Sequence, residues 1–132
     1  MTTDDDLRAA GKEVQGKLWP ATLTAPAGQF PAAKLAPEFF DYVQQTAFGM
    51  IWTRPGLDPY ARRLLVLATT AALGRWEEFR LHLAAGMTRD LEWADVEEVL
   101  LQTAVYAGVP IGNTGFIIAA EERERRRLSA NL

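Results

Sequence analysis

The sequence predicts an all-α protein of about six helices. Apolar residues recur at helical spacing along nearly the whole chain, and no segment shows the alternation of a half-buried strand. Proline, glycine and capping residues also divide the chain into segments of helical length. With 132 residues, 48% of them hydrophobic and 23% charged, the chain fits one globular domain. We therefore expect a single domain over residues 1–132.

The first predicted helix covers residues 4–18. Thr3 is a suitable N-cap, and three consecutive aspartates after it favour the positive end of the helix dipole. The segment 19–35 is rich in proline and contains glycine, which predicts a loop. A loop of about 17 residues is long for a compact domain and is often functional.

Prolines mark the starts of the next two predicted helices. Pro37 suits the first turn of a helix over 37–52. Asp58 as N-cap and Pro59 at the first helical position begin a helix over 59–73. Its stretch "LLVLATTAAL" is apolar nearly all round, which is typical of a central helix or a subunit interface. We therefore expect a homo-oligomer.

Three further helices are predicted after Gly74, which ends or kinks the third. The fourth carries Glu78 and His82, and the fifth covers "WADVEEVLLQTAVY". On the fifth helix one apolar face is formed by Val96, Val99, Leu100, Thr103 and Ala104. Pro110 begins a last helix that runs into the arginine-rich carboxyl end.

Composition excludes several classes of function. The net charge is −3 without a dominant basic patch, so we expect no nucleic-acid partner. No apolar run is long enough to span a membrane, and the acidic amino terminus does not resemble a signal peptide, so we expect a cytoplasmic protein. The chain contains no cysteine, which excludes thiol chemistry. One histidine and scattered carboxylates lack the spacing of a metal site, so we expect no metal.

Glu78 and His82 are the first candidate site residues. Residues four apart lie on the same face of a helix, so the two side chains can meet. A carboxylate beside an imidazole orients the ring and raises its pKa, which allows general acid–base catalysis near neutral pH. The alternative is an ordinary ion pair on the helix surface.

Arginines are the other candidates. Arg54, in the turn "WTRPGLD", and Arg62 and Arg63, early in the third helix, could each bind a carboxylate through two hydrogen bonds. A solvated or salt-bridging role on the surface is the alternative for each of them.

Several segments together resemble the carboxymuconolactone decarboxylase family. They are the turn "RPGLD" with Arg62 shortly after it, the pair Glu78 and His82, and "EVLLQTAVYAGVP", in this order. The resemblance covers residues 35–121, whereas the helix and loop of residues 1–34 diverge. It implies an all-α fold that assembles into trimers or hexamers with active sites near subunit contacts.

The resemblance also implies an activity. One branch of the family uses a Cys-x-x-Cys pair for peroxidase chemistry, which this cysteine-free chain cannot perform. The remaining branch decarboxylates 4-carboxymuconolactone in aromatic catabolism. In that reaction the electron pair left by carbon dioxide moves into the lactone carbonyl, so no cofactor is needed. The protein must stabilise the oxyanion, protonate carbon and hold a small acidic substrate.

These demands assign a role to each candidate. His82 is expected to donate the proton, Glu78 to orient it, and Arg62 or Arg54 to bind the substrate carboxylate. The divergent segment "GKEVQGKLWP", and "DLEW" where the family has glycine followed by Leu-Thr, leave the substrate open. Alternatives are an isomerase or lactone-processing enzyme acting on another small ring, or a non-catalytic helical scaffold that binds a ligand.

Overall fold

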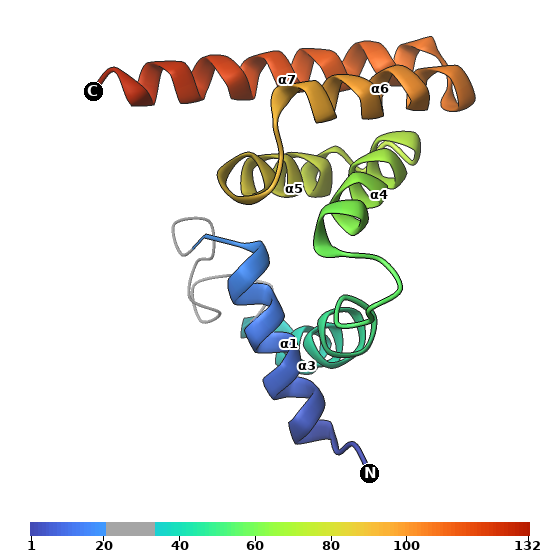
Figure 1. Cartoon of the computed structure of the whole chain (residues 1–132), viewed down its shortest axis with the longest axis vertical. Helices are drawn as coiled ribbons and strands as arrows, with labels where there is room; N and C mark the ends of the chain where they lie inside the picture. Colours follow the sequence, from blue (N-terminus) through green and yellow to red (C-terminus); the bar gives the residue numbers. More distant parts are fainter. Residues whose placement is uncertain (21–33) are drawn as a thin grey trace. The chain divides into compact units, whose positions relative to one another are not determined.

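The computed structural model describes residues 1–20 and 34–132, and every regular element within them is helical (Figure 1). The prediction of an all-α fold is therefore confirmed. Residues 21–33 of the predicted loop lie outside the described residues. The chain divides into two compact units, Met1–Arg62 and Arg63–Leu132.

The first unit contains helix α1 (Asp4–Leu18), which begins and ends as predicted. The Thr3 hydroxyl accepts the backbone N–H of Asp6 at 3.1 Å, and the Asp6 carboxylate accepts the N–H of Thr3 at 2.9 Å. This reciprocal capping box satisfies two N–H groups that a helix start leaves without partners. The capping bonds to Thr3 also lower the pKa of Asp6.

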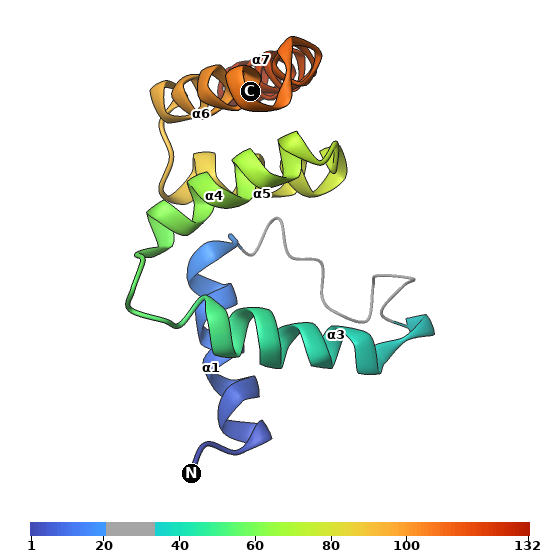
Figure 2. The same ribbon diagram turned by 90° about the vertical axis from the view of Figure 1, so that its right-hand side faces the viewer.

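The predicted helix over 37–52 has two different parts. Helix α3 (Pro37–Val43) continues directly into the π-helical segment η2 (Gln44–Ile51), as Figure 2 shows. The Trp52 N–H reaches back five residues to the Ala47 carbonyl at 2.9 Å, which is the π-helical pattern. Helical periodicity in the sequence did not reveal this widening.

Polar contacts join α1 to α3 and η2 within the first unit. Arg8 donates two hydrogen bonds to Asp41, from Nε to Oδ1 at 2.6 Å and from Nη2 to Oδ2 at 2.9 Å. Gln44 donates from its side-chain amide to Gln15 at 2.7 Å. The Arg8 guanidinium lowers the pKa of the Asp41 carboxyl. These contacts fix the register of α1 against α3 and η2.

Helix α4 (Pro59–Ala72) begins in the first unit and continues as the first helix of the second. Its start is capped as predicted, because Asp58 accepts the backbone N–H of Ala61 at 2.7 Å. The chain leaves α4 through Gly74, whose φ of 69° is a left-handed conformation that glycine adopts without strain.

The second unit continues with α5 (Trp76–Arg89), α6 (Trp93–Ala107) and α7 (Val109–Ala130). Gly108 separates α6 from α7, and the two helices lie side by side in Figures 1 and 2. All four helices of this unit and the turn after α5 contribute to its core. The buried residues of the core are Leu67, Ala71, Phe79, Leu83, Leu91, Val96, Leu100, Ile118 and Ala119.

Candidate functional site

Helix α5 presents its two candidate residues differently. Phe79 and Leu83 turn into the core and are fully buried. His82 is partly buried, whereas Glu78 is exposed. One turn of the same helix therefore places the imidazole against the protein and the carboxylate in solvent.

The partner of His82 is an arginine that lies 19 residues earlier in the chain. Nη1 of Arg63 lies 3.0 Å from Nδ1 of His82. Nε of the same guanidinium lies 3.5 Å from Oδ1 of Asp90, the residue that follows the end of α5. The Arg63 side chain is fully buried, and the Asp90 side chain is 22% exposed. Arg63, His82 and Asp90 are called the arginine–histidine cluster below.

The surroundings of the cluster disfavour a second positive charge. Burial, and then the charge of Arg63, lower the pKa of His82 from its ordinary 6.5 to about 3. His82 is therefore neutral at physiological pH. Burial also raises the pKa of Asp90, although the nearby guanidinium opposes that shift.

Two expectations about the histidine change as a result. Within the residues that the structure describes, the Glu78 side chain makes no hydrogen bond or ion pair, so the contact with His82 that the i,i+4 spacing permits is not formed. The expected rise in the pKa of His82 was wrong in direction, because burial and a cation replace the carboxylate. Arg63, not Glu78, orients the ring through its contact with Nδ1.

The sequence had suggested Arg63 only as one of three arginines able to bind a carboxylate, and it had suggested no role for Asp90; neither residue was expected to contact His82. One signal was present in the sequence: Arg63, Leu67 and Ala71 follow each other at intervals of four on α4. All three are fully buried, so they form one inward-facing stripe. An arginine on such a stripe requires a buried partner.

Arg54 and Arg62 lie together in the first unit. Nη2 of Arg62 donates to the backbone carbonyl of Arg54 at 3.1 Å, which braces the turn before α4. Arg54 is exposed and lines a cavity of about 490 Å³ between α1 and this turn. Other residues along the cavity include Lys17, Trp52 and Leu57. The structure therefore leaves the guanidinium of Arg54 accessible within a concave surface.

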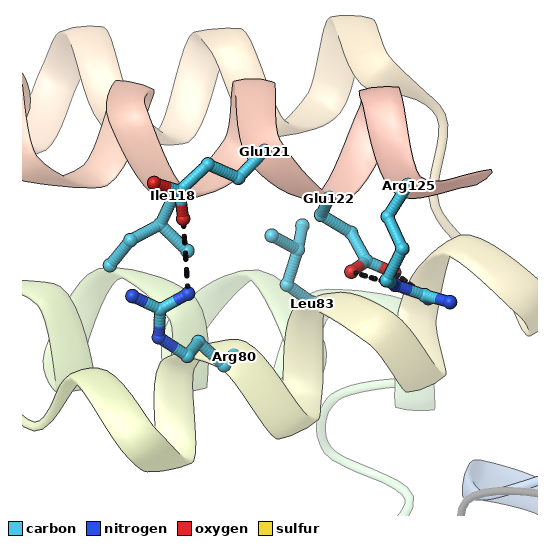
Figure 3. A pocket seen from close by; sticks show the side chains of 6 residues that line it. All are labelled: Arg80, Leu83, Ile118, Glu121, Glu122 and Arg125. Atoms are coloured by element: carbon cyan, nitrogen blue, oxygen red, sulfur yellow. Dashed lines mark hydrogen bonds and ion pairs between the residues drawn. The ribbon is translucent and has the colours of Figure 1, made fainter. Parts of the chain in front are cut away.

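A second cavity, of about 240 Å³, lies between α5 and α7 and is shown in Figure 3. Arg80 forms an ion pair with Glu121 at 3.3 Å, and Arg125 pairs with Glu122 at 2.5 Å. The charges along this cavity are thus mutually compensated. None of the four residues predicted to form the site lines it.

Residues 1–20 and 34–132 contain no group of three or more histidine or carboxylate side chains able to hold a metal ion. The helices in the same ranges are too short or too polar to cross a membrane.

Comparison with known proteins identifies relatives that are decarboxylases by name. The chain is 34% identical over 84 residues to a 4-carboxymuconolactone decarboxylase from Acinetobacter baylyi, a match that covers 64% of this chain and 63% of that protein. It is 33% identical over 70 residues to a nitrosuccinic acid decarboxylase from Metarhizium robertsii, covering 53% of this chain and 49% of the relative. The chain thus spans less than two thirds of the length of either curated relative.

The model of the carboxymuconolactone decarboxylase family matches residues 37–121. The chain belongs to this family, as the order of its sequence segments predicted. The matched region contains every residue of the arginine–histidine cluster, together with Glu78, Arg54 and Arg62.

Proposed function

We propose that the protein is a cofactor-free decarboxylase that acts on a small carboxylic acid. Both relatives are named for removing carbon dioxide from an acid that bears a further electron-accepting group, a lactone in one and a nitro group in the other. Such a group accepts the electron pair that carbon dioxide leaves behind, so the substrate supplies its own electron sink. A lactone such as 4-carboxymuconolactone is the first substrate to test.

We assign the chemistry at the reacting carbon to α5. The sequence led us to expect His82 to donate the proton and Glu78 to orient it. Because Arg63 holds the ring and the pKa of His82 is lowered, we instead propose that His82 contacts the substrate through its ring and that Glu78, one turn earlier on the helix, exchanges a proton with the substrate. The exposure of Glu78 suits this role, because a carboxylate in solvent can regain its proton from water.

We assign recognition of the substrate carboxylate to Arg54 and Arg62. A planar guanidinium binds a carboxylate through two parallel hydrogen bonds. Arg54 is the more accessible of the two, whereas Arg62 already donates one N–H to the turn that carries Arg54. Loss of Arg54 should therefore weaken substrate binding directly.

One observation carries the proposal: the only histidine of the chain is partly buried and is held by a fully buried arginine. A surface ion pair, the ordinary alternative, would leave the ring in solvent beside Glu78. A non-catalytic scaffold is the second candidate, because His82 lines neither of the two cavities described above.

The test is release of carbon dioxide from 4-carboxymuconolactone and from nitro-substituted dicarboxylic acids. The wild-type protein should turn over one of them, and His82→Gln should lower kcat by about 10²–10⁴-fold while the helical content persists. Glu78→Gln should have a smaller effect on kcat. Arg54→Met should raise KM, whereas Arg75→Met, which removes another exposed arginine, should not. Full activity in His82→Gln would contradict the assignment, and ligand binding without turnover would favour the scaffold.

A further inference from the structure

The arginine–histidine cluster determines which ring nitrogen of His82 carries hydrogen. An arginine side chain has N–H donors and no acceptor. At 3.0 Å from Nη1 of Arg63, Nδ1 of His82 must therefore offer its lone pair. A neutral imidazole that accepts at Nδ1 has its hydrogen on Nε2.

The charges around the ring also favour the neutral form of His82. A protonated ring would bring an N–H of its own against the buried guanidinium, so the hydrogen bond would be replaced by repulsion between two cations. Arg63 is in direct contact with the ring, and Asp90 lies on the far side of the guanidinium. Burial and the charge of Arg63 lower the pKa of the ring to about 3, in agreement with this geometry.

Asp90 restrains the arginine from the other side. Its carboxylate lies 3.5 Å from Nε of Arg63, while Nη1 contacts His82. The guanidinium is planar, so contacts at two of its edges fix its plane and the direction of its N–H groups. The end of α5 thereby orients a side chain of α4 toward the middle of α5.

We propose that Arg63 is a positioning residue that holds His82 as the neutral ring with its hydrogen on Nε2. His82 then serves the substrate as a hydrogen-bond donor and keeps its proton. This inference rests on the proposed decarboxylase function and defines the part that His82 plays in it.

The reaction step balances with a neutral histidine. The bond between the ring carbon and the carboxylate breaks, carbon dioxide leaves, and the electron pair moves into the accepting group as an oxyanion. The Nε2–H of His82 donates a hydrogen bond to that oxyanion, which is a fixed dipole aimed at developing charge. A proton from Glu78 or water then adds to carbon. A neutral imidazole held in this way is an established form of electrophilic catalysis in proteins.

Nitrogen NMR of the ring tests the inference without any substrate. The chain contains one histidine, so a tag-free sample labelled with ¹⁵N in the imidazole gives one pair of ring signals. We expect a protonated Nε2 and an unprotonated, hydrogen-bonded Nδ1 that persist from neutral pH to below about pH 5. A hydrogen on Nδ1, or titration near the ordinary 6.5, would overturn the proposal even if the protein proves to be a decarboxylase.

Variants then test the role of the arginine. Arg63→Met removes the cation and the donor, so the histidine should titrate at a higher pH and populate both neutral forms. Arg89→Met removes an exposed arginine from α5 and should leave the ring signals unchanged. Unchanged ring signals in Arg63→Met would contradict the proposal. If Arg63→Met does not fold, Asp90→Asn serves instead, because it removes the carboxylate and leaves the guanidinium. This variant should keep the hydrogen on Nε2 and the pKa of His82 low, and titration of its ring near 6.5 would count against the proposal.

The pH dependence of turnover separates positioning from a merely structural role. Between about pH 5 and 8, the kcat of the wild type should not rise or fall through ionisation of His82, because the ring stays neutral. In Arg63→Met, kcat should become dependent on the ionisation of His82 in this pH range, and the substitution should affect kcat more than KM. A wild-type profile that falls as His82 loses a proton near neutrality would show that the protonated ring is the active form.

Discussion

A β-carbon on Gly11 would overlap the backbone carbonyl oxygen of Gln44, so α1 and η2 meet backbone to backbone. A second close approach joins the same two helices, because a β-carbon on Gly49 of η2 would lie 2.5 Å from the carbonyl oxygen of Leu7 in α1. Gln44 is also the first residue of the π-helical segment. Two glycines thus permit the close approach of helices on which the first unit depends.

Gly11→Ala should destabilise the protein. The added methyl group meets backbone, which cannot rotate away, and overpacking of this kind typically costs about 1–3 kcal/mol. Gly16→Ala is the matched control on the same helix, because its β-carbon would meet nothing within 4 Å. It should be neutral or stabilise by up to about 1 kcal/mol through helix propensity. Urea unfolding of both variants measures the difference, and equal free energies of unfolding would show that α1 and η2 do not meet as described.

Stability should fall as the solution becomes mildly acidic. The pKa of His82 is about 3 in the folded protein and near 6.5 when the chain is unfolded, so the unfolded state binds the proton first. The contribution of the neutral ring to stability is complete above about pH 6.5 and decreases toward pH 3, by at most about 1.4 kcal/mol per pH unit.

His82→Gln isolates this effect. The variant retains Asp90 and every other carboxylate, so its unfolding free energy should depend less on pH than that of the wild type between about pH 5 and 7. Chemical denaturation at equal protein concentration provides the comparison. Parallel pH profiles for the two proteins would mean that His82 titrates normally in the folded state.

The sequence was sufficient to predict most helix boundaries because their signals are local. Thr3, Asp58 and Gly74 each act through backbone groups within a few residues, and the helices begin or end beside them as predicted. The π-helical segment was not predicted, because its widened turns retain an apolar pattern close to that of an α-helix. The approach of Gly11 to Gln44 depends on tertiary packing between separate elements.

The candidate site shows the same division between local and tertiary information. Glu78 and His82 were found because i,i+4 neighbours can be read from the sequence. The arginine that reaches the ring lies 19 residues away on another helix, and only packing selects Arg63 for that contact rather than its neighbour Arg62. The sequence identified the histidine as a candidate, which stays a prediction, but it supplied the wrong electrostatic partner.

The protein is expected to assemble into a trimer or hexamer. Leu101 and Val105 lie four residues apart on α6 and are 48% and 79% exposed in the single chain. The neighbouring Tyr106 and Val109 are 85% and 77% exposed. Exposed apolar side chains gathered in this way are typical of a surface that another protein covers.

A charge placed on this surface should break the assembly. Val105→Glu puts a carboxylate where an apolar contact is expected, and burying it without a partner is costly, so sedimentation should show smaller species. Lys12→Glu adds the same carboxylate at an exposed position of α1 and should leave the assembly intact. A wild-type protein that sediments as a monomer at micromolar concentration would contradict the prediction. An oligomer unaffected by Val105→Glu would place the interface on another face of the chain.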